Sequence, residues 1–194
     1  MRLMDSEGRV LSPAVFMEKS KEYRLYTQLM SQMIDKVFHV MENHDVAMTI
    51  NLSYVDINNP ELCDVLIDKV KKMKIGSRLT VEIVESEQIE DLEMINEFIF
   101  SLKKLGVLIA IDDFGSGYSN FSHILQLNVD IIKIDGSLIK NIDKSELSLQ
   151  LVKAIVAFAK ASDKIVIAEF IHNKIVMDIV KELGISYGQG FYLG

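Results

Sequence analysis

The sequence is poor in cysteine and has no long apolar run. Cys63 is the single cysteine among 194 residues, so an intramolecular disulfide is excluded. This fits a reducing compartment, and we expect the chain to be cytoplasmic. No apolar run approaches the ~20 residues that cross a bilayer, and no basic segment followed by an apolar one opens the chain. We therefore expect a soluble chain without membrane contact.

Positive charge is also scarce. Lys and Arg total 21 against 28 Asp and Glu, which gives a formal net charge of −7. This balance argues against a general binder of nucleic-acid polymers or membrane surfaces. An acidic protein that handles a phosphate needs a metal or a few well-placed cations. Hydrophobic residues make up 49% of the chain, enough to bury the core of one domain over residues 1–194.

Short apolar segments rich in Ile, Val and Leu recur along the chain and read as strands that are mostly buried on both faces. They span residues 47–52, 79–84, 107–111, 131–134, 165–168 and, more weakly, 185–193. The stretches between them carry apolar residues at helical spacing, such as Leu62, Leu66 and Val70. This serial alternation predicts an α/β fold with a parallel sheet.

Helix boundaries can also be placed. A helical region begins at Ser12-Pro13 and runs to about Asn43 with a break near Glu22 and Tyr23. Pro60 opens a later helix, and Gly106 and Gly184 stand where helices should stop. A (β/α)8 barrel needs eight strands, whereas an open doubly wound sheet accepts six, so length alone favours the open sheet.

Polar side chains interrupt the apolar strands near their carboxyl ends. They are Asn51, Glu82, Asp112 with Asp113, Lys133 with Asp135, Glu169 and Gln189. Parallel strands place those ends on one rim, and burying an isolated ion there is costly unless it is paired or binds a metal. One such residue alone is usually an exposed side chain. Repetition over successive strands predicts one convergent site.

The donor atoms narrow the chemistry of that site. Carboxylate and amide oxygens are present without a plausible thiolate or clustered histidines, which suits Mg²⁺ or Mn²⁺ better than Zn²⁺. Adjacent Asp112 and Asp113 could bridge two ions, an arrangement used for in-line displacement at phosphorus. Gly115 and Gly117 follow and predict a flexible loop, with Ser116 and Ser119 able to hydrogen-bond locally.

These motifs closely resemble the EAL domain family, bacterial phosphodiesterases that cleave cyclic di-GMP to linear pGpG. The resemblance covers nearly all 194 residues. The matching elements, in the family order, are Asn51-Leu52-Ser53, Glu82 with Glu85, Asp112-Asp113-Phe114-Gly115-Ser116-Gly117-Tyr118-Ser119, Lys133-Ile134-Asp135, Ala168-Glu169 and Gln189-Gly190. Ser116 stands where the family usually has threonine.

The resemblance implies a (β/α)8 TIM-like barrel with two divalent ions, Mg²⁺ or Mn²⁺. The ligands it implies are Asn51, Glu82, Asp112 and Asp113. By the same resemblance Glu169 completes the metal site or assists the attacking water, Lys133 orients that water, and Gln189 supports the site. Arg2 is similar to the arginine that contacts the substrate phosphate.

Further expectations come from the same resemblance. Glu85 and Asp135 would support the Asp112-Asp113 loop, and Glu85 would also contribute to dimer coupling. Family members often dimerise through the segment after that loop, here about residues 119–143, and usually follow sensor or GGDEF-type domains in a longer protein. We therefore expect cyclic di-GMP as ligand, a homodimer, and an upstream sensor or GGDEF-type domain.

The sequence departs from the family pattern in two places. The glutamate of the Glu-Ala-Leu motif would precede Met1, and the usual continuation beyond Gly194 is absent, so we expect a fragment lacking the first strand and the C-terminal end of the barrel. Phe170 replaces a glycine and His172 an acid. Phe170 could narrow the pocket, and His172 could be a metal ligand or merely a solvent-facing or helix-capping residue.

Two main functions stay open on these grounds. One is metal-dependent hydrolysis of cyclic di-GMP, and the other is a degenerate domain that binds the dinucleotide and signals to a partner. A weaker alternative, set apart from the resemblance, is a barrel that enolises a sugar or organic acid with Lys133 as base and carboxylates on one Mg²⁺.

Overall fold

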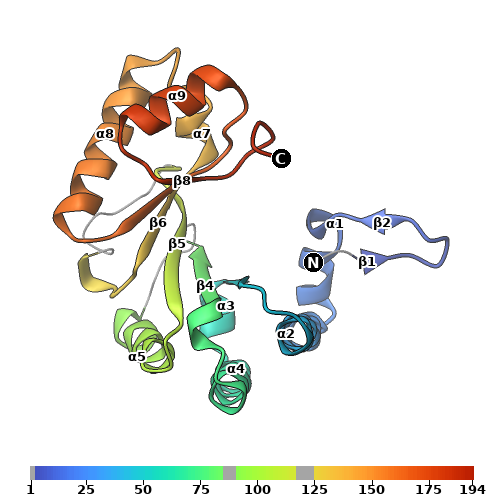
Figure 1. Ribbon diagram of the computed structural model, residues 1–194. Coiled ribbons are helices and arrows are strands. Elements are labelled where there is room, and N and C mark those ends of the chain that lie inside the picture. The colour runs from blue at the N-terminus through green and yellow to red at the C-terminus, as the bar shows by residue number, and fades with distance from the viewer. Residues whose placement is uncertain (1–2, 85–90, 117–124) are drawn as a thin grey trace.

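A computed structural model describes residues 3–84, 91–116 and 125–194 (Figure 1). Its centre is a six-stranded parallel sheet. The strands are β3 (Met48–Leu52), β4 (Leu79–Val84), β5 (Leu108–Phe114), β6 (Ile131–Ile134), β7 (Ile165–Ala168) and β8 (Tyr187–Gly188). An α/β fold with a parallel sheet, as predicted, is confirmed.

The strand order is that of a barrel. Each strand pairs with its sequence neighbours, in the order β3-β4-β5-β6-β7-β8. In a doubly wound sheet the order of the strands reverses at a switch point. No such reversal of strand order occurs among the described strands. Length alone favoured an open doubly wound sheet, and that interpretation was wrong. The strand order agrees instead with the TIM-like barrel that the resemblance implies. In Figure 1 the helices α2, α4, α5, α8 and α9 succeed one another around the strands.

The longer helices begin and end where local chemistry predicts. They are α1 (Pro13–Glu22), α2 (Tyr26–Asn43), α4 (Pro60–Met73), α5 (Leu92–Lys103), α8 (Glu146–Ala161) and α9 (Lys174–Glu182). Asn59 caps α4 by accepting a hydrogen bond from the Leu62 backbone N–H at 3.3 Å. The predicted break between α1 and α2 is confirmed, and positive φ angles of 84° at Gly106 and 75° at Gly184 follow α5 and α9.

Short elements complete the chain. They are α3 (Tyr54–Ile57), a 3₁₀ helix (Gly76–Arg78) and α7 (Gly136–Ile139), together with an antiparallel hairpin of β1 (Leu3–Met4) and β2 (Val10–Leu11). The hairpin was not predicted from the sequence, and it lies apart from the sheet in Figure 1. Its turn is held by Asp5, whose carboxylate accepts hydrogen bonds from the backbone N–H groups of Glu7 and Arg9, both at 2.9 Å.

Of the six predicted strands, three have the observed bounds, the one predicted at 47–52 begins one residue later at Met48, and two needed larger corrections. The strand predicted at 107–111 continues to Phe114, because a register shift between Ile111 and Phe114 returns the fully buried Phe114 to the sheet beside Ile134. The weak segment 185–193 contains only the two residues of β8. After β8 the chain turns, with the Leu193 N–H donating to the Gly190 carbonyl at 2.9 Å.

The core lies between the sheet and the inner faces of the helices. Ile95, Ile99 and Leu102 of α5 are fully buried and belong to the same apolar cluster as Ile109 of β5. The apolar side chains leave the carboxyl ends of the strands as the place where polar groups gather. Among the described residues no helix combines the length and apolar character needed to cross a membrane.

Candidate active site

Lys133 lies at the centre of the polar cluster. Its ammonium Nζ is 2.6 Å from Oδ1 of Asp112, 2.7 Å from Oε1 of Glu169 and 3.0 Å from Oε2 of Glu82. These residues come from β6, β5, the end of β7 and β4, so four adjacent strands contribute. The Lys133 side chain is only 6% exposed, and the three carboxylates are between 11% and 15% exposed. The structure thus brings together four residues that the sequence predicted for one site.

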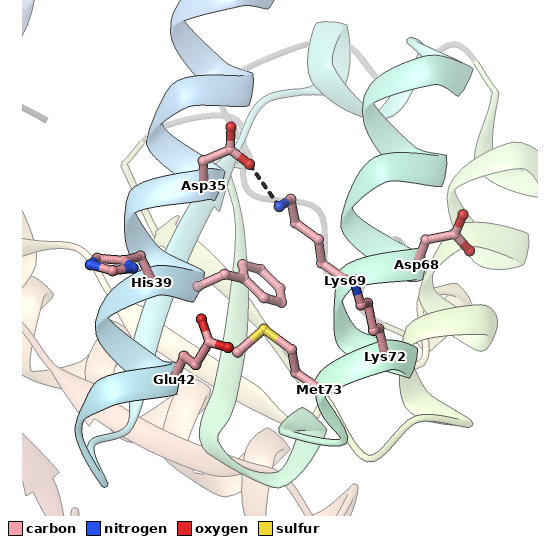
Figure 2. A pocket seen from close by; sticks show the side chains of 8 residues that line it. Asp35, His39, Glu42, Asp68, Lys69, Lys72 and Met73 are labelled. Carbon is pink, nitrogen blue, oxygen red and sulfur yellow. Dashed lines mark ion pairs between the residues drawn. The ribbon is translucent and has the colours of Figure 1, made fainter.

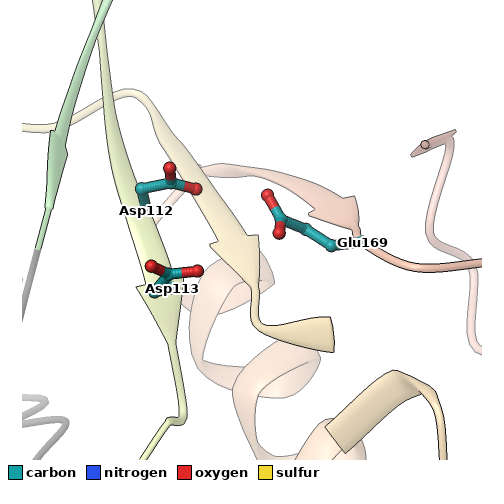
Figure 3. Close-up of side chains that lie close together, drawn as sticks. All are labelled: Asp112, Asp113 and Glu169. Atoms are coloured by element: carbon teal, nitrogen blue, oxygen red, sulfur yellow. The ribbon is translucent and has the colours of Figure 1, made fainter. Parts of the chain in front are cut away.

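A tighter group of carboxylates borders this cluster (Figure 3). Asp112, Asp113 and Glu169 each offer one oxygen, and these oxygens lie within 4.8 Å of one another. Consecutive residues of a regular strand point to opposite faces. Asp113 instead has a φ of 55° and lies in the register shift of β5, so that both aspartates are on the side facing Glu169. A backbone irregularity therefore builds the paired carboxylates.

Burial and the crowding of negative charges raise the pKa values of three acidic groups in the site. Burial raises the pKa of Glu169 to about 7, with a further contribution from Asp112 and an opposing one from Lys133. Burial likewise raises the pKa of Glu82, against the opposing charge of Lys133. For Asp113, burial and the neighbouring Asp112 and Asp135 raise the pKa. One ammonium cannot neutralise four carboxylates.

The pKa of their cationic partner, Lys133, is also raised. Burial alone would lower the pKa of Lys133, but hydrogen bonds to Asp112 and Glu169 outweigh it and the pKa lies above its ordinary value. Lys133 is therefore charged at neutral pH and is unsuited to act as a general base. This argues against the enolising reaction considered from the sequence.

The donor set fits divalent cations. Hard oxygen atoms on Asp112, Asp113 and Glu169 converge, with Glu82 adjacent, and together the four carboxylates exceed the charge of Lys133. Such an excess of acidic oxygens is suited to Mg²⁺ or Mn²⁺. Asn51 is in register with Glu82 on the neighbouring strand and is exposed at the same rim.

Two further predicted residues lie beside this group. The Gln189 side-chain amide donates to Oε1 of Glu169 at 3.1 Å. Asp135 donates its backbone N–H to the Phe114 carbonyl at 3.0 Å, and its carboxylate accepts from the Ser137 backbone N–H at 2.9 Å. Asp135 thereby links the end of β5 to α7.

Ser116, in the turn after β5, donates its backbone N–H to the Asp113 carbonyl at 3.2 Å.

Several predicted residues lie outside the described residues. These are Arg2, Glu85, Gly117, Tyr118, Ser119 and the first part of the expected dimerisation segment, up to residue 124. Their assignments stay predictions from the sequence.

Phe170 lines a cavity of about 460 Å³ and does not fill it. Glu169, Asp135 and Gln189 line the same cavity, which therefore adjoins the carboxylate group. His172 is half-buried, with its Nδ1 3.3 Å from the Phe170 carbonyl oxygen and its Nε2 3.0 Å from the Asn173 amide nitrogen. It does not belong to the metal-ligand group found among the described residues, and Asn173 provides the cap of α9.

Two residues near this cavity were missed from the sequence. Phe191 lines it, and the Nζ of Lys140 lies 5.7 Å from the centre of the Phe170 ring. Phe191 follows Gln189-Gly190 directly, which was a usable signal. For Lys140 there was none, because its position depends on the turn of α7.

Another hollow, of about 400 Å³, lies between α2 and α4 (Figure 2). Its charges are mixed, and Asp35 forms an ion pair with Lys69 at 2.7 Å across it. None of the residues predicted for the site lines it. The polar cluster around Lys133 is therefore the better candidate for the active site.

The EAL domain family model matches residues 1–194. The chain belongs to the EAL domain family. Among curated relatives, it is 32% identical to the cyclic di-GMP phosphodiesterase PdeA of Borreliella burgdorferi, over 98% of this chain and 29% of that protein. It is 28% identical to PdeB of Shewanella oneidensis, over 100% of this chain and 23% of that protein. The chain thus spans less than a third of the length of these relatives.

Solved EAL structures share the fold. The FimX EAL domain of Pseudomonas aeruginosa bound to c-di-GMP matches with a TM-score of 0.90 and 25% identity, over 99% of this chain and 79% of that one. The PaMucR phosphodiesterase in complex with c-di-GMP matches with a TM-score of 0.87 at 24% identity, over 100% and 81% of the two chains. The TIM-like α/β architecture of the EAL family is therefore that of this chain.

Proposed function

We propose that this EAL domain hydrolyses one phosphodiester bond of cyclic di-GMP to give linear pGpG, in bacterial second-messenger signalling. The observation that supports this proposal most directly is the Lys133-centred cluster, in which one buried ammonium lies within 3.0 Å of Glu82, Asp112 and Glu169. The similarity to cyclic di-GMP phosphodiesterases supports this substrate.

Asn51, Glu82, Asp112 and Asp113 would hold two Mg²⁺ or Mn²⁺ ions, with Glu169 completing the site. Such ions supply Lewis-acid stabilisation of the phosphate and activation of water. Lys133, charged and fixed by its three carboxylates, orients the water for attack on phosphorus. Alternatively, Glu169, whose carboxylate lies 2.7 Å from the Lys133 ammonium, would assist that water instead of completing the metal site. Gln189 holds Glu169 in place, and Arg2 contacts the substrate phosphate.

A receptor role is the second candidate. The observation in its favour is that Phe170 lines the cavity beside Glu169 and that His172 contacts Phe170, at positions where the family pattern has a glycine and an acid. In that case cyclic di-GMP binds without cleavage and the domain signals to a partner. Restoring glycine and glutamate at these two positions should then create activity.

The test is chromatographic. The full-length protein, incubated with cyclic di-GMP and Mn²⁺ or Mg²⁺, should yield pGpG, and a metal-free control should not. Asp113→Asn should abolish product while the circular dichroism spectrum is retained. Asp178→Asn, which changes an exposed carboxylate of α9, is the matched control and should leave turnover unchanged. Unchanged turnover in Asp113→Asn would refute the assigned site, and bound but uncleaved cyclic di-GMP in the wild type would establish the receptor.

We also propose a cytoplasmic homodimer that carries an upstream sensor or GGDEF-type domain. The region after β5, about residues 119–143, would form its interface. Light scattering of the full-length protein should give twice the monomer mass, and a monomer at micromolar concentration would contradict the dimer.

A further inference from the structure

Phe170 occupies a position next to the reacting groups. It directly follows Glu169, and both residues line the cavity of about 460 Å³ at the carboxyl end of β7. This volume lies in the range of pockets that hold small organic ligands, roughly 300–1,000 Å³. A ligand whose phosphate lies at the carboxylates would thus have its remaining parts within reach of the Phe170 ring.

The backbone at Phe170 is held in an unfavourable conformation. Its φ is 58°, in the left-handed region that bulky side chains rarely adopt and that glycine adopts freely. Burial of the ring does not compensate for this backbone conformation, because Phe170 is 39% exposed. Backbone strain of this kind collects at binding and catalytic sites, where it positions a group for its task. An exposed ring at a strained position next to Glu169 therefore indicates a role in binding.

Neighbouring groups fix the direction of the ring. Gly136 leaves space for it, since a Cβ atom at position 136 would lie 2.9 Å from the Cβ of Phe170. The Phe191 ring approaches edge-on with 6.5 Å between centroids, and the His172 ring is tilted at 5.6 Å. Lys140 places its ammonium 5.7 Å from the ring centre. The ring is thereby held as one wall of the cavity.

We propose that the Phe170 ring is a stacking platform for one purine base of the cyclic dinucleotide and so determines its affinity for this chain. This inference rests on the proposed function. Aromatic side chains stack on the flat face of a base, and the polar Asp135 and Gln189 in the same lining can meet the edge of the base. Lys140 adds a positive charge beside the ring, in keeping with an anionic ligand.

The experiment separates binding from turnover in the full-length protein. Calorimetry gives the Kd of cyclic di-GMP in the Asp113→Asn background, and steady-state kinetics with Mn²⁺ give kcat and KM without that change. Phe170→Leu removes the aromatic face, Phe170→Tyr keeps it, and Phe170→Gly removes the ring while accepting the positive φ. Phe100→Leu is the matched control, because Phe100 is 56% exposed and also has a lysine over its ring, Lys104 at 4.1 Å, but lies on α5.

Base stacking contributes about 1–3 kcal/mol, which corresponds to about 5-fold to 160-fold in affinity. We expect Phe170→Leu and Phe170→Gly each to raise Kd and KM within that range and to change kcat less than about threefold. Phe170→Tyr and Phe100→Leu should keep the wild-type Kd.

An unchanged or lowered Kd in Phe170→Leu and Phe170→Gly would overturn the platform while leaving the proposed function intact. A lowered Kd would show that the ring obstructs the cavity. If the protein with Phe170 in place neither binds nor cleaves cyclic di-GMP, the proposed function fails as well.

Discussion

The ammonium of Lys133 and the carboxylate of Asp112 lie 2.6 Å apart on the adjacent strands β6 and β5, with side-chain exposures of 6% and 11%. Such a buried pair adds little net stability, because removing both charges from water costs about as much as their attraction returns. Loss of only one partner is different, since the other charge then stays buried without compensation. The pair therefore couples the site to the stability of the barrel.

The first prediction concerns Lys133→Met. With the ammonium gone, Glu82, Asp112 and Glu169 lose their shared partner, and we expect the free energy of unfolding in EDTA to fall by about 3–5 kcal/mol. Urea unfolding measures it. Lys174→Met is the control: it removes the same charge from the exposed pair with Asp178 and should have no measurable effect. An equal loss of unfolding free energy in both variants would mean that the Lys133 ammonium does not compensate the buried carboxylates.

The second prediction concerns metal ions. A cation that binds the folded state alone stabilises it by about 2.7 kcal/mol at a concentration 100 times its Kd. We expect Mn²⁺ to raise the Tm of the wild type and to raise that of Asp112→Asn much less, because Asp112 provides one of the converging oxygens. Scanning calorimetry with and without Mn²⁺ gives both shifts. Asp178→Asn should respond like the wild type, and an equal response in Asp112→Asn would place the ion elsewhere.

The third prediction links Gly136 and Phe170. An alanine at position 136 would place its Cβ 2.9 Å from that of Phe170, closer than such atoms approach. Gly136→Ala should therefore displace the ring and lower stability by about 1–3 kcal/mol through overpacking. In the Phe170→Gly background the same change should cost much less. A double-mutant cycle measured by urea unfolding isolates this coupling, and additive effects would exclude direct contact.

The fourth prediction concerns Cys63. Burial, with help from the nearby Asp64 and Asp56, raises the pKa of the Cys63 thiol to about 11. The thiol Sγ also lies 3.2 Å from the Ile57 carbonyl oxygen. Because the thiolate is the reactive form, we expect the folded protein at pH 8 to react with a disulfide reagent about 100-fold more slowly than the unfolded chain. The rate should keep rising above pH 9. A plateau near pH 9 would show an ordinary thiol.

Much of the fold followed from local pattern. The bounds of β4, β6 and β7 were predicted correctly because their apolar runs are short and end at polar residues. The hairpin of β1 and β2 was missed because its strands have two residues each, too few for any periodicity. The extent of β5 was misjudged because two charged residues normally end a buried strand, whereas here a register shift carries the strand past them.

The sequence alone determined which residues approach one another: polar groups at the ends of successive parallel strands must meet on one rim, and this placed Glu82, Asp112, Lys133 and Glu169 together. Only the tertiary structure decided how they meet. The contact of one ammonium with three carboxylates depends on strand register and side-chain direction across four strands. The barrel order and the position of Phe170 between Gly136, Lys140 and Phe191 likewise depend on long-range packing, which no window of sequence contains.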